Sequence, residues 1–374
     1  MTDLPEITER QLRWYRFRRS GLLKPFGSAI LCAEQLAGVQ AQILPAAGLA
    51  LWNRTPRFTN SEFQRLLYQD RTLVKLWGQR GTLHLYPSKD WPLICGARSG
   101  QGTWLVNRYL SMGGDLDKFH QDAATVVEAA RKMPSIGRSD LRNMNLGLDE
   151  HLLSSWGGIF AYLVKTGELC HGPQEGGEGR FIHRENWLPG LNWRPPSFSE
   201  ANIRLARRYL HCYGAASPQD LAYWRGAKSS ELKEWLKALE PELTTVEQGG
   251  KDLLLLKQDL PTLLEEPPIP SKWPVKLLYR FDPYLLGQKN KDWLVEPEHQ
   301  KKVWIAAGHI EGNLLVGGRI KGTWRYERKG KTLNITAWPF QTLGKEVWRK
   351  LWTQGKKVAR FFDLKPGEFR MEEI

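Results

Sequence analysis

The sequence predicts an α+β protein with three tandem winged-helix units followed by a small C-terminal antiparallel β-barrel. The first observation behind this prediction is a repeat: over residues 1–260, helix patterns followed by one short hairpin occur three times. Asp140-Leu141 and Asp220-Leu221 take matching places in two of these repeats. The second observation is a run of strand patterns with Gly-bearing turns after residue 274. The length of 374 residues accommodates two or three domains at ~150 residues per domain.

The first predicted winged helix covers residues 1–100. Apolar residues at helical spacing, a proline that can open a helix and polar capping residues mark its helices. Its predicted elements are helices over 7–19 and 28–40, shorter helices that begin at Pro45 and at Asn60 or Ser61, and strands over 73–77 and 82–86 around a Gly-bearing turn.

The second and third predicted winged helices cover residues 101–196 and 197–260. In the third, Ser217 followed three residues later by an acidic residue is a helix-start signal. The second is predicted to contain helices over 121–132 and 154–165, a short helix from 137, and strands over 168–171 and 179–183 that flank a Gly-rich loop. The third is predicted to contain helices over 200–212 and 230–239, a short helix from 217, and strands over 243–247 and 252–257.

The C-terminal part begins after a proline-rich stretch. Residues 261–274 contain five prolines and are predicted to form a linker. Residues 275–374 are predicted to form a small antiparallel β-barrel, or alternatively an antiparallel sheet, which a basic helix over 345–362 closes.

The positive charge of the chain is unevenly distributed. The formal net charge is +14 and the sequence pI is about 9.6. Residues 1–100 carry +7, residues 101–270 carry −3 and residues 271–374 carry +10. A basic groove shared by the two terminal regions would bind a polyanion such as nucleic acid. The alternative is that Lys and Arg only solvate surface helices.

Several function classes find no support in the sequence. The four cysteines are scattered without a Cys-x-x-Cys pair, which favours reduced thiols in a cytoplasm and predicts no metal site. The sequence shows no apolar run of about 20 residues and no signal segment, so we expect no membrane span and no secretion. Familiar hydrolase motifs are missing. Asp282 could act as an acid or base, but an Asp before Pro more often caps a turn.

Seventeen tryptophans raise the alternative of a sugar-binding protein. Trp156, Trp235 and Trp304 lie at apolar periodic positions, however, which favours packing in the core.

Four segments in this order resemble the AlkZ-like family of bacterial DNA glycosylases. They are Gly38-Val-Gln-Ala-Gln42, Trp77-Gly-Gln-Arg-Gly-Thr-Leu-His-Leu85, Phe281-Asp-Pro-Tyr-Leu-Leu-Gly287 and Gly318-Arg-Ile-Lys-Gly-Thr-Trp324. The similarity spans about residues 10–340. It implies tandem winged helices, a C-terminal β-barrel and excision of bulky alkylated bases, including interstrand crosslinks.

The resemblance places the family's Gln-aliphatic-Gln catalytic signature on Gln40 and Gln42, with the small Ala41 between them. On a continuous helix, two residues at this spacing would point to different sides, so the helix must end near Pro45 for them to converge. An amide cannot take a proton as a carboxylate does, but it can orient a water molecule. This suits a cationic N7- or N3-alkylated purine, which leaves as a neutral base.

The resemblance also implies DNA contacts, with Arg180 in a hairpin that probes the minor groove. The candidate DNA-binding residues are Arg80, His84, Arg180, Lys321, Arg325, Arg328 and Lys329. The alternatives are a packed strand position for His84 and a mobile surface loop for the Gly-rich hairpin.

We therefore expect a monofunctional DNA glycosylase that acts as a cytoplasmic, nucleoid-associated monomer on duplex DNA containing alkylated purines. It is expected to need no cofactor and no metal, and to leave an abasic site. Two alternatives are a winged-helix regulator that binds DNA without cleaving it and a carbohydrate-active or carbohydrate-binding protein.

Overall fold

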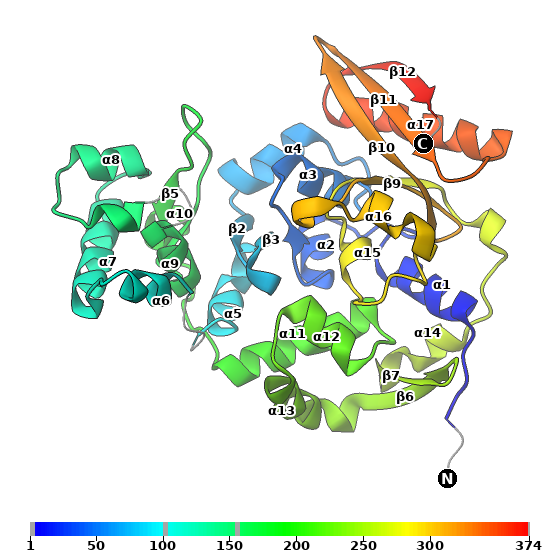
Figure 1. Ribbon diagram of the computed structural model, residues 1–374, viewed down its shortest axis with the longest axis horizontal. Helices are drawn as coiled ribbons and strands as arrows, with labels where there is room; N and C mark the ends of the chain where they lie inside the picture. Colours follow the sequence, from blue (N-terminus) through cyan, green and yellow to red (C-terminus); the bar gives the residue numbers. More distant parts are fainter. Residues whose placement is uncertain (1–3, 100–103, 154–157, 373–374) are drawn as a thin grey trace. The chain divides into compact units, whose positions relative to one another are not determined.

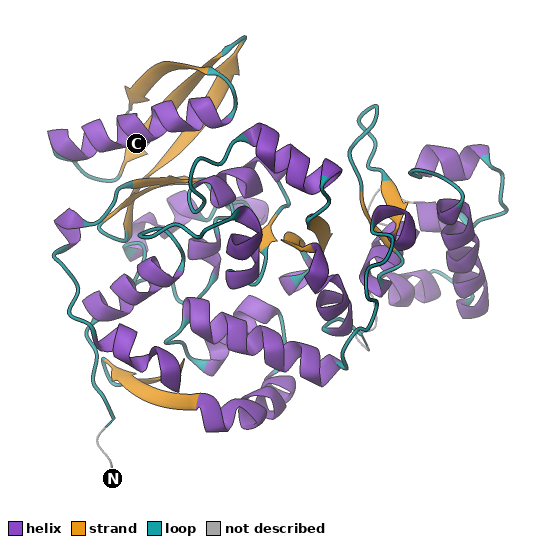
Figure 2. Cartoon of the chain, turned by 180° about the vertical axis from the view of Figure 1, so that it is seen from behind, coloured by secondary structure: helices purple, strands orange, loops and turns teal. Residues whose placement is uncertain are grey.

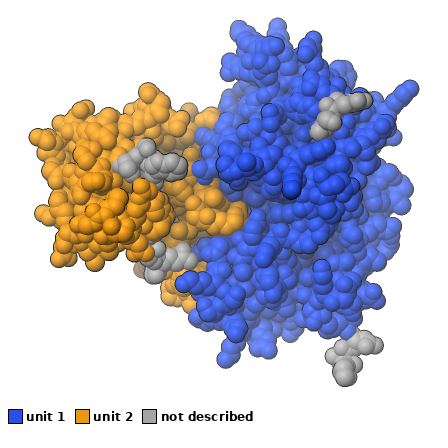
Figure 3. All heavy atoms as spheres, viewed as in Figure 1, with its two compact units in different colours: residues 1–63, 203–374 blue, residues 64–202 orange. Residues whose placement is uncertain are grey.

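The computed structural model describes residues 4–99, 104–153 and 158–372 (Figure 1). The chain divides into two compact units, which Figure 3 shows in different colours. Unit 1 comprises residues 1–63 and 203–374, and unit 2 comprises residues 64–202. These boundaries differ from those of the five predicted segments, and the division into three winged helices, a linker and a C-terminal domain stays a prediction.

The N-terminal part of unit 1 is helical, and it corrects one predicted helix. A capping box of Thr8 and Gln11 starts the first helix. The predicted helix over 28–40 ends early because Ala37 and Gly38 take positive φ values of 52° and 104°, and the Gly38 N–H donates to the Ala33 carbonyl at 2.8 Å. The observed elements are α1 (Glu9–Arg19), α2 (Ala29–Gln35), β1 (Val39–Gln40), α3 (Leu44–Trp52) and α4 (Asn60–Gln64).

The segment that follows residue 197 contains the predicted helices and hairpin in the predicted order. The Ser217 hydroxyl accepts from the Asp220 N–H, and the Asp220 carboxylate accepts from the Ser217 N–H, so the predicted helix start is confirmed. The elements are α11 (Phe198–Tyr213), α12 (Pro218–Arg225), α13 (Ser229–Leu239), β6 (Leu243–Gln248), β7 (Lys251–Leu256) and α14 (Leu260–Leu264).

The C-terminal sheet is open and mixed, so the predicted closed antiparallel barrel is wrong. Its order is β12-β11-β10-β9-β8, and in the part of the chain that the structure describes β12 and β8 are unpaired edges of this sheet. Strands β11 and β12 run parallel because a helix connects them instead of a hairpin. The elements are β8 (Lys276–Leu278), α15 (Pro283–Leu286), α16 (Gln300–Val303), β9 (Gly312–Val316), β10 (Arg319–Lys329), β11 (Thr332–Pro339), α17 (Lys345–Phe361) and β12 (Lys365–Met371).

The basic helix α17 packs against this sheet (Figure 2). The approach is close at Gly355, where an added Cβ would lie 2.9 Å from the Phe369 ring and 3.0 Å from the Ile335 side chain. The helix is therefore the crossover between two parallel strands, not the closure of a barrel.

Aromatic residues fill much of the core of unit 1. Trp273, at the end of the proline-rich stretch, is 1% exposed, and its ring lies 4.7 Å from Trp14. Trp235 is also buried and Trp304 is partly buried, which confirms the core interpretation for these two residues. Trp156 lies outside the described residues.

Unit 2 repeats the order seen after residue 197. Ile136 bridges Phe181 just before a short helix, as Ala216 bridges Leu254 before α12. The elements of unit 2 are β2 (Leu73–Trp77), β3 (Leu83–Pro87), α5 (Trp91–Gly96), α6 (Trp104–Ser111), α7 (Leu116–Arg131), α8 (Arg138–Asn143), α9 (Gly158–Thr166), β4 (Leu169–His171), β5 (Phe181–His183) and α10 (Arg184–Trp187).

Candidate nucleic-acid interface

Gln40 and Gln42 lie in the connection between β1 and α3, not at a helix end. Gln40 is the last residue of β1 and is 6% exposed, whereas Gln42 is exposed in the loop that enters α3. A helix would direct Gln40 and Gln42 to different sides, but this connection is not helical, so the backbone does not force the two side chains apart in that way. Pro45 lies in the first turn of α3, where it begins the helix rather than ending one.

The entry into α3 differs from the two equivalent helix entries. Helices α8 and α12 each begin with an acidic side chain, Asp140 or Asp220, that accepts from the N-cap backbone. The N-cap of α3 is Ile43, which makes no side-chain capping bond. The N-cap residue of α3 therefore provides no side-chain cap for the first turn of this helix, which lies next to Gln42.

Arg80 and His84 belong to the β2–β3 hairpin of unit 2. Arg80 sits in the turn with a left-handed φ of 53°. His84 is 4% exposed, its Nδ1 lies 3.0 Å from the Thr82 carbonyl oxygen and its ring stacks on Tyr86. This packing favours the alternative of a packed strand residue for His84.

The Gly-rich hairpin of unit 2 is a regular two-residue turn. The backbones of Glu175 and Glu178 exchange hydrogen bonds of 3.1 and 2.9 Å, and Gly176 and Gly177 between them take positive φ values. The Glu178 carboxylate accepts from the Ser139 hydroxyl at 2.5 Å and from the N–H groups of Arg138 and Ser139 at the start of α8. The Ser139 hydrogen bond is the main cause that lowers the pKa of Glu178.

Arg180 is held inside this hairpin. Its side chain is 10% exposed and pairs with Asp140 at 2.6 Å and with Glu175 at 3.4 Å. It also donates to the carbonyl oxygen of Ser135 at 3.0 Å. These contacts favour a structural role for Arg180 over the predicted reach toward DNA.

The four predicted phosphate contacts of the C-terminal sheet lie on β10, mostly beside carboxylates. Lys321 lies 3.7 Å from Glu296, Arg325 binds Glu311 through two bonds of 2.9 and 2.7 Å, and Lys329 lies 3.5 Å from Glu327. Arg328 is exposed and donates to the Gly330 carbonyl.

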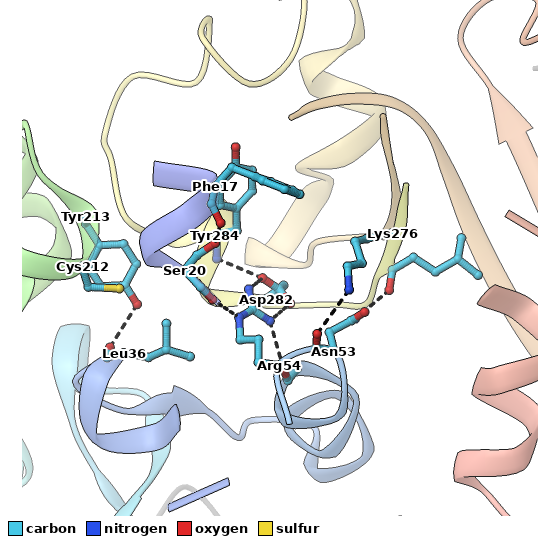
Figure 4. Close-up of polar contacts among 12 residues, drawn as sticks. Phe17, Ser20, Leu36, Asn53, Arg54, Cys212, Tyr213, Lys276, Asp282 and Tyr284 are labelled. Carbon is cyan, nitrogen blue, oxygen red and sulfur yellow. Dashed lines mark hydrogen bonds and ion pairs between the residues drawn. The ribbon is translucent and has the colours of Figure 1, made fainter. Parts of the chain in front are cut away.

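Asp282 caps a turn, as the alternative interpretation expected. Its carboxylate accepts from the Tyr284 N–H at 3.0 Å and forms a two-bond ion pair with Arg54 at 2.8 and 2.6 Å, both side chains being fully buried (Figure 4). Arg54 also donates to the Ser20 carbonyl. The pair joins the end of α3 to the start of α15 and is out of contact with solvent.

One cavity of unit 1 carries both signs of charge. It has a volume of about 1000 Å³ and lies between α1, the start of α12 and residues 288–297. Arg13 there pairs with Glu9, and Arg319 pairs with Glu296. Its charged lining residues are Glu9, Arg13, Arg16, Asp220, Lys251, Asp252, Lys289, Asp292, Glu296 and Arg319. The balance of signs gives this cavity no preference for a polyanion.

A second cavity of unit 1, of about 410 Å³, is lined by basic residues without acidic ones. We call it the α17 cleft and define it by Pro25, Trp52, Asn53, Thr55, Arg57, Phe58, Thr59, Lys276, Gln354, Lys357, Arg360 and Phe361. None of its four cations was among the candidate DNA-binding residues predicted from the sequence. The high basic content of residues 345–362 was the only signal that pointed toward it.

Among the described residues, no helix is long and apolar enough to cross a bilayer. The same residues contain no group of three or more His, Cys, Asp or Glu side chains placed to hold a metal ion. All four cysteines are free thiols, three of them buried.

Comparisons with known proteins point in one direction. A family model described as DNA glycosylase AlkZ-like matches residues 33–361. The interstrand DNA cross-link repair glycosylase of Streptomyces sahachiroi is 29% identical over 345 residues, which cover 88% of this chain and 90% of that protein. The solved structure of Streptomyces sahachiroi DNA glycosylase AlkZ superposes with a TM-score of 0.84 at 26% identity, covering 98% of this chain and 100% of that one.

Proposed function

The chain belongs to the AlkZ-like family of DNA glycosylases, and from this membership we propose that it hydrolyses the N-glycosidic bond of bulky, cationic purines alkylated at N7 or N3 in duplex DNA. The similar protein of Streptomyces sahachiroi is described as an interstrand DNA cross-link repair glycosylase. We extend this substrate class to the present chain. A crosslink through the N7 atoms of two purines carries the same cationic leaving groups as a single adduct.

The family match over residues 33–361 is the observation that carries this proposal. The recurring order of short helix, helix and hairpin supports the accompanying proposal that the three repeats are winged helices, the fold that commonly docks a helix on duplex DNA. Net charge of +14 suits the same partner. We further propose that the enzyme works as a monomer on nucleoid DNA.

In the proposed mechanism, Gln40 and Gln42 orient the attacking water. An amide oxygen accepts a hydrogen bond from water, and an amide nitrogen donates one elsewhere, so two amides can hold water in line with C1′ of the sugar. Their oxygens also face the cationic sugar that develops as the base leaves. The non-helical backbone from β1 to Ile43 is compatible with this arrangement.

The chemistry requires a leaving group that is already activated. A purine alkylated at N7 is cationic and departs neutral, so the enzyme supplies no proton to the base. The N-glycosidic bond breaks with its electron pair going to the cationic base, water adds to C1′ and loses one proton to solvent, and the products are the neutral free base and an abasic site. Neutral lesions lack this activation, and we therefore expect little excision of them.

The test is excision from a duplex that contains one N7-methylguanine, with the wild type beside Gln40→Ala and Gln42→Ala. Each variant is expected to lose at least 10²-fold in the single-turnover rate while its affinity for the duplex stays near that of the wild type. Gln35→Ala is the matched control, because Gln35 is a partly exposed glutamine on the neighbouring helix α2.

Two outcomes would contradict the proposal. Tight DNA binding without release of N7-methylguanine or of a bulkier N7 adduct would favour the regulator instead. Full activity in both Gln variants would keep the glycosylase but remove Gln40 and Gln42 from its mechanism.

A further inference from the structure

The α17 cleft gathers four cations from three separate parts of the chain. Arg57 comes from the loop after α3, Lys276 from β8, and Lys357 and Arg360 from α17. The aromatic rings of Trp52 and Phe58 lie 6.3 and 6.4 Å from that of Phe361 and form an apolar wall between them. Because all these elements belong to unit 1, the cleft is complete within one compact unit.

Among the described residues, these cations form no direct ion pair with the protein. Within residues 4–99, 104–153 and 158–372, none of the four side chains lies within ion-pair distance of a carboxylate. Backbone carbonyl groups also occupy these cations little. Among the described residues, Lys276 is the only one of the four that donates to a carbonyl oxygen, that of Asn53, at a long distance of 3.5 Å (Figure 4). Burial lowers the pKa of Lys276 to about 8; the nearby cations Arg54 and Lys357 act in the same direction, and the Asp282 carboxylate acts in the opposite one. Like charges held close together without a carboxylate at ion-pair distance cost free energy, and a bound anion would reduce this cost.

A buried hydroxyl in the same cleft also lacks a partner. Thr55 is 7% exposed, and its Oγ1 forms no hydrogen bond in the structure. Buried polar atoms are nearly always satisfied, so an unpaired one points to a missing ligand or water. A hydroxyl can donate to an oxyanion. The side-chain oxygen of Asn53 is also unpaired, but as an acceptor it suits the Lys276 ammonium or water rather than the anion.

The positive surface continues from the cleft along α17. Arg349 and Lys357 are exposed, and Lys356 is partly exposed. From Arg349 to Arg360 the helix rises ~16 Å, at 1.5 Å per residue. This length corresponds to roughly five nucleotides of one DNA strand, which rises about 3.4 Å per nucleotide. A row of phosphates therefore matches the surface better than a single small anion does.

We propose that the α17 cleft binds a backbone phosphate of the DNA duplex and that the exposed cations of α17 bind its neighbours on the same strand. This inference rests on the proposed function for the identity of the polyanion. The contact is independent of base sequence, because the cleft offers ammonium, guanidinium and hydroxyl donors to phosphate oxygens. It involves no bond-making step.

The test compares the salt dependence of binding to an undamaged duplex. The variant Lys357→Gln/Arg360→Gln removes two exposed cations of the cleft, and Lys301→Gln/Lys302→Gln removes two exposed cations of α16 and has the same net charge. Each lost phosphate contact makes the slope of log K against log salt shallower by ~0.9. We expect a slope shallower by about 1 to 2 in the cleft variant and an unchanged slope in the control. Thr55→Val should weaken binding severalfold without a change in slope.

The outcomes separate this inference from the proposed function. A wild type that excises N7-methylguanine while the cleft variant keeps the wild-type slope would overturn the cleft assignment alone. An equal loss in the α16 control would also overturn it, because net charge would then explain the effect. A third outcome is that inorganic phosphate, at constant ionic strength, thermally stabilises the wild type but not the cleft variant, while the two proteins show the same slope for DNA binding. The cleft would then be assigned to a small phosphate ion instead of DNA. If the wild type does not excise N7-methylguanine, the proposed function is contradicted. The slope of log K against log salt for duplex binding then still tests the cleft assignment.

Discussion

Unit 1 carries basic side chains in two regions that differ in how their charge is neutralised. On β10, Lys321 and Arg325 lie beside Glu296 and Glu311. In the α17 cleft, the four lining cations have no carboxylate within ion-pair distance among the described residues. The two elements that carry most of these cations, β10 and α17, look similarly basic in the sequence. The local electrostatic field therefore depends on which carboxylates the fold brings near each cation, and a count of charges per region of the sequence does not contain this information.

The largest expected effect concerns a cation next to the cleft that does have a partner. Replacing Asp282 by Ala leaves the fully buried Arg54 without its carboxylate. Removing one member of a buried ion pair typically costs about 3–5 kcal/mol, so we expect a loss of that size in the free energy of unfolding. Urea titration followed by circular dichroism measures it. The exposed Asp363→Asn serves as control, and similar midpoints for both variants would contradict the prediction.

A second variant should make the β10 region resemble the cleft. Glu311→Gln removes the carboxylate that binds Arg325 and that lies 3.8 Å from Arg280. The two guanidinium groups would then be available to phosphate, and the slope of log K against log salt for duplex binding should steepen by ~0.9 for each one that reaches a phosphate, up to ~2. An unchanged slope would show that this face of β10 does not approach DNA.

The cleft should also lose charge within an accessible pH range. The pKa of Lys276 is lowered from 10.5 to about 8 by burial. Its positive charge is therefore present in the folded protein below pH 8 and lost as the pH rises through 8, while the unfolded chain keeps it up to about pH 10.5. The contribution of Lys276 to the free energy of unfolding therefore rises as the pH increases from about 8 to about 10.5.

For binding, the same titration predicts severalfold weaker association with duplex at pH 9 than at pH 7 at equal ionic strength. Lys276→Gln should bind more weakly at pH 7 and show less change with pH. Fluorescence anisotropy with a labelled duplex measures both. A pH dependence that persists in full in Lys276→Gln would assign it to another group.

The smallest effect is expected where an ion pair is fully solvated. Lys329 and Glu327 lie 3.5 Å apart, with both side chains more than 60% exposed. Exchanging Lys329 for Gln should change the free energy of unfolding by less than about 0.5 kcal/mol. A chemical denaturation curve that shifts clearly from that of the wild type would show that this pair does more than its exposure indicates.

Local sequence signals predicted the secondary structure of the repeats well. The strands β2, β4 and β6 and the helix start at Ser217 lie within a residue or so of their predicted places. These elements depend on apolar spacing, glycine turns and capping side chains, which act over a few residues. The helix predicted over 28–40 failed because the positive φ of Ala37, a residue that rarely takes this conformation, ends it early.

The candidate site was predictable only in part. The Gln-Ala-Gln segment was found through resemblance, since two glutamines have no distinctive pattern of their own, and their catalytic role stays a prediction. Arg180 looked like a free cation of a surface loop, whereas Asp140 and Glu175 neutralise it. The cleft cations were missed because Arg57 and Arg360 are about 300 residues apart in the chain.

The α+β class, the recurring order of helices and hairpins and the basic character follow from the amino-acid sequence alone. Membership of a DNA glycosylase family does so as well. These properties depend on short-range patterns and on similarity to known chains. Tertiary structure alone decided that the C-terminal sheet is open, that Asp282 is buried against Arg54, and which cations keep their charge unneutralised. Long-range pairing decides such features, because a charge or a strand edge takes its partner from any part of the chain that the fold brings near.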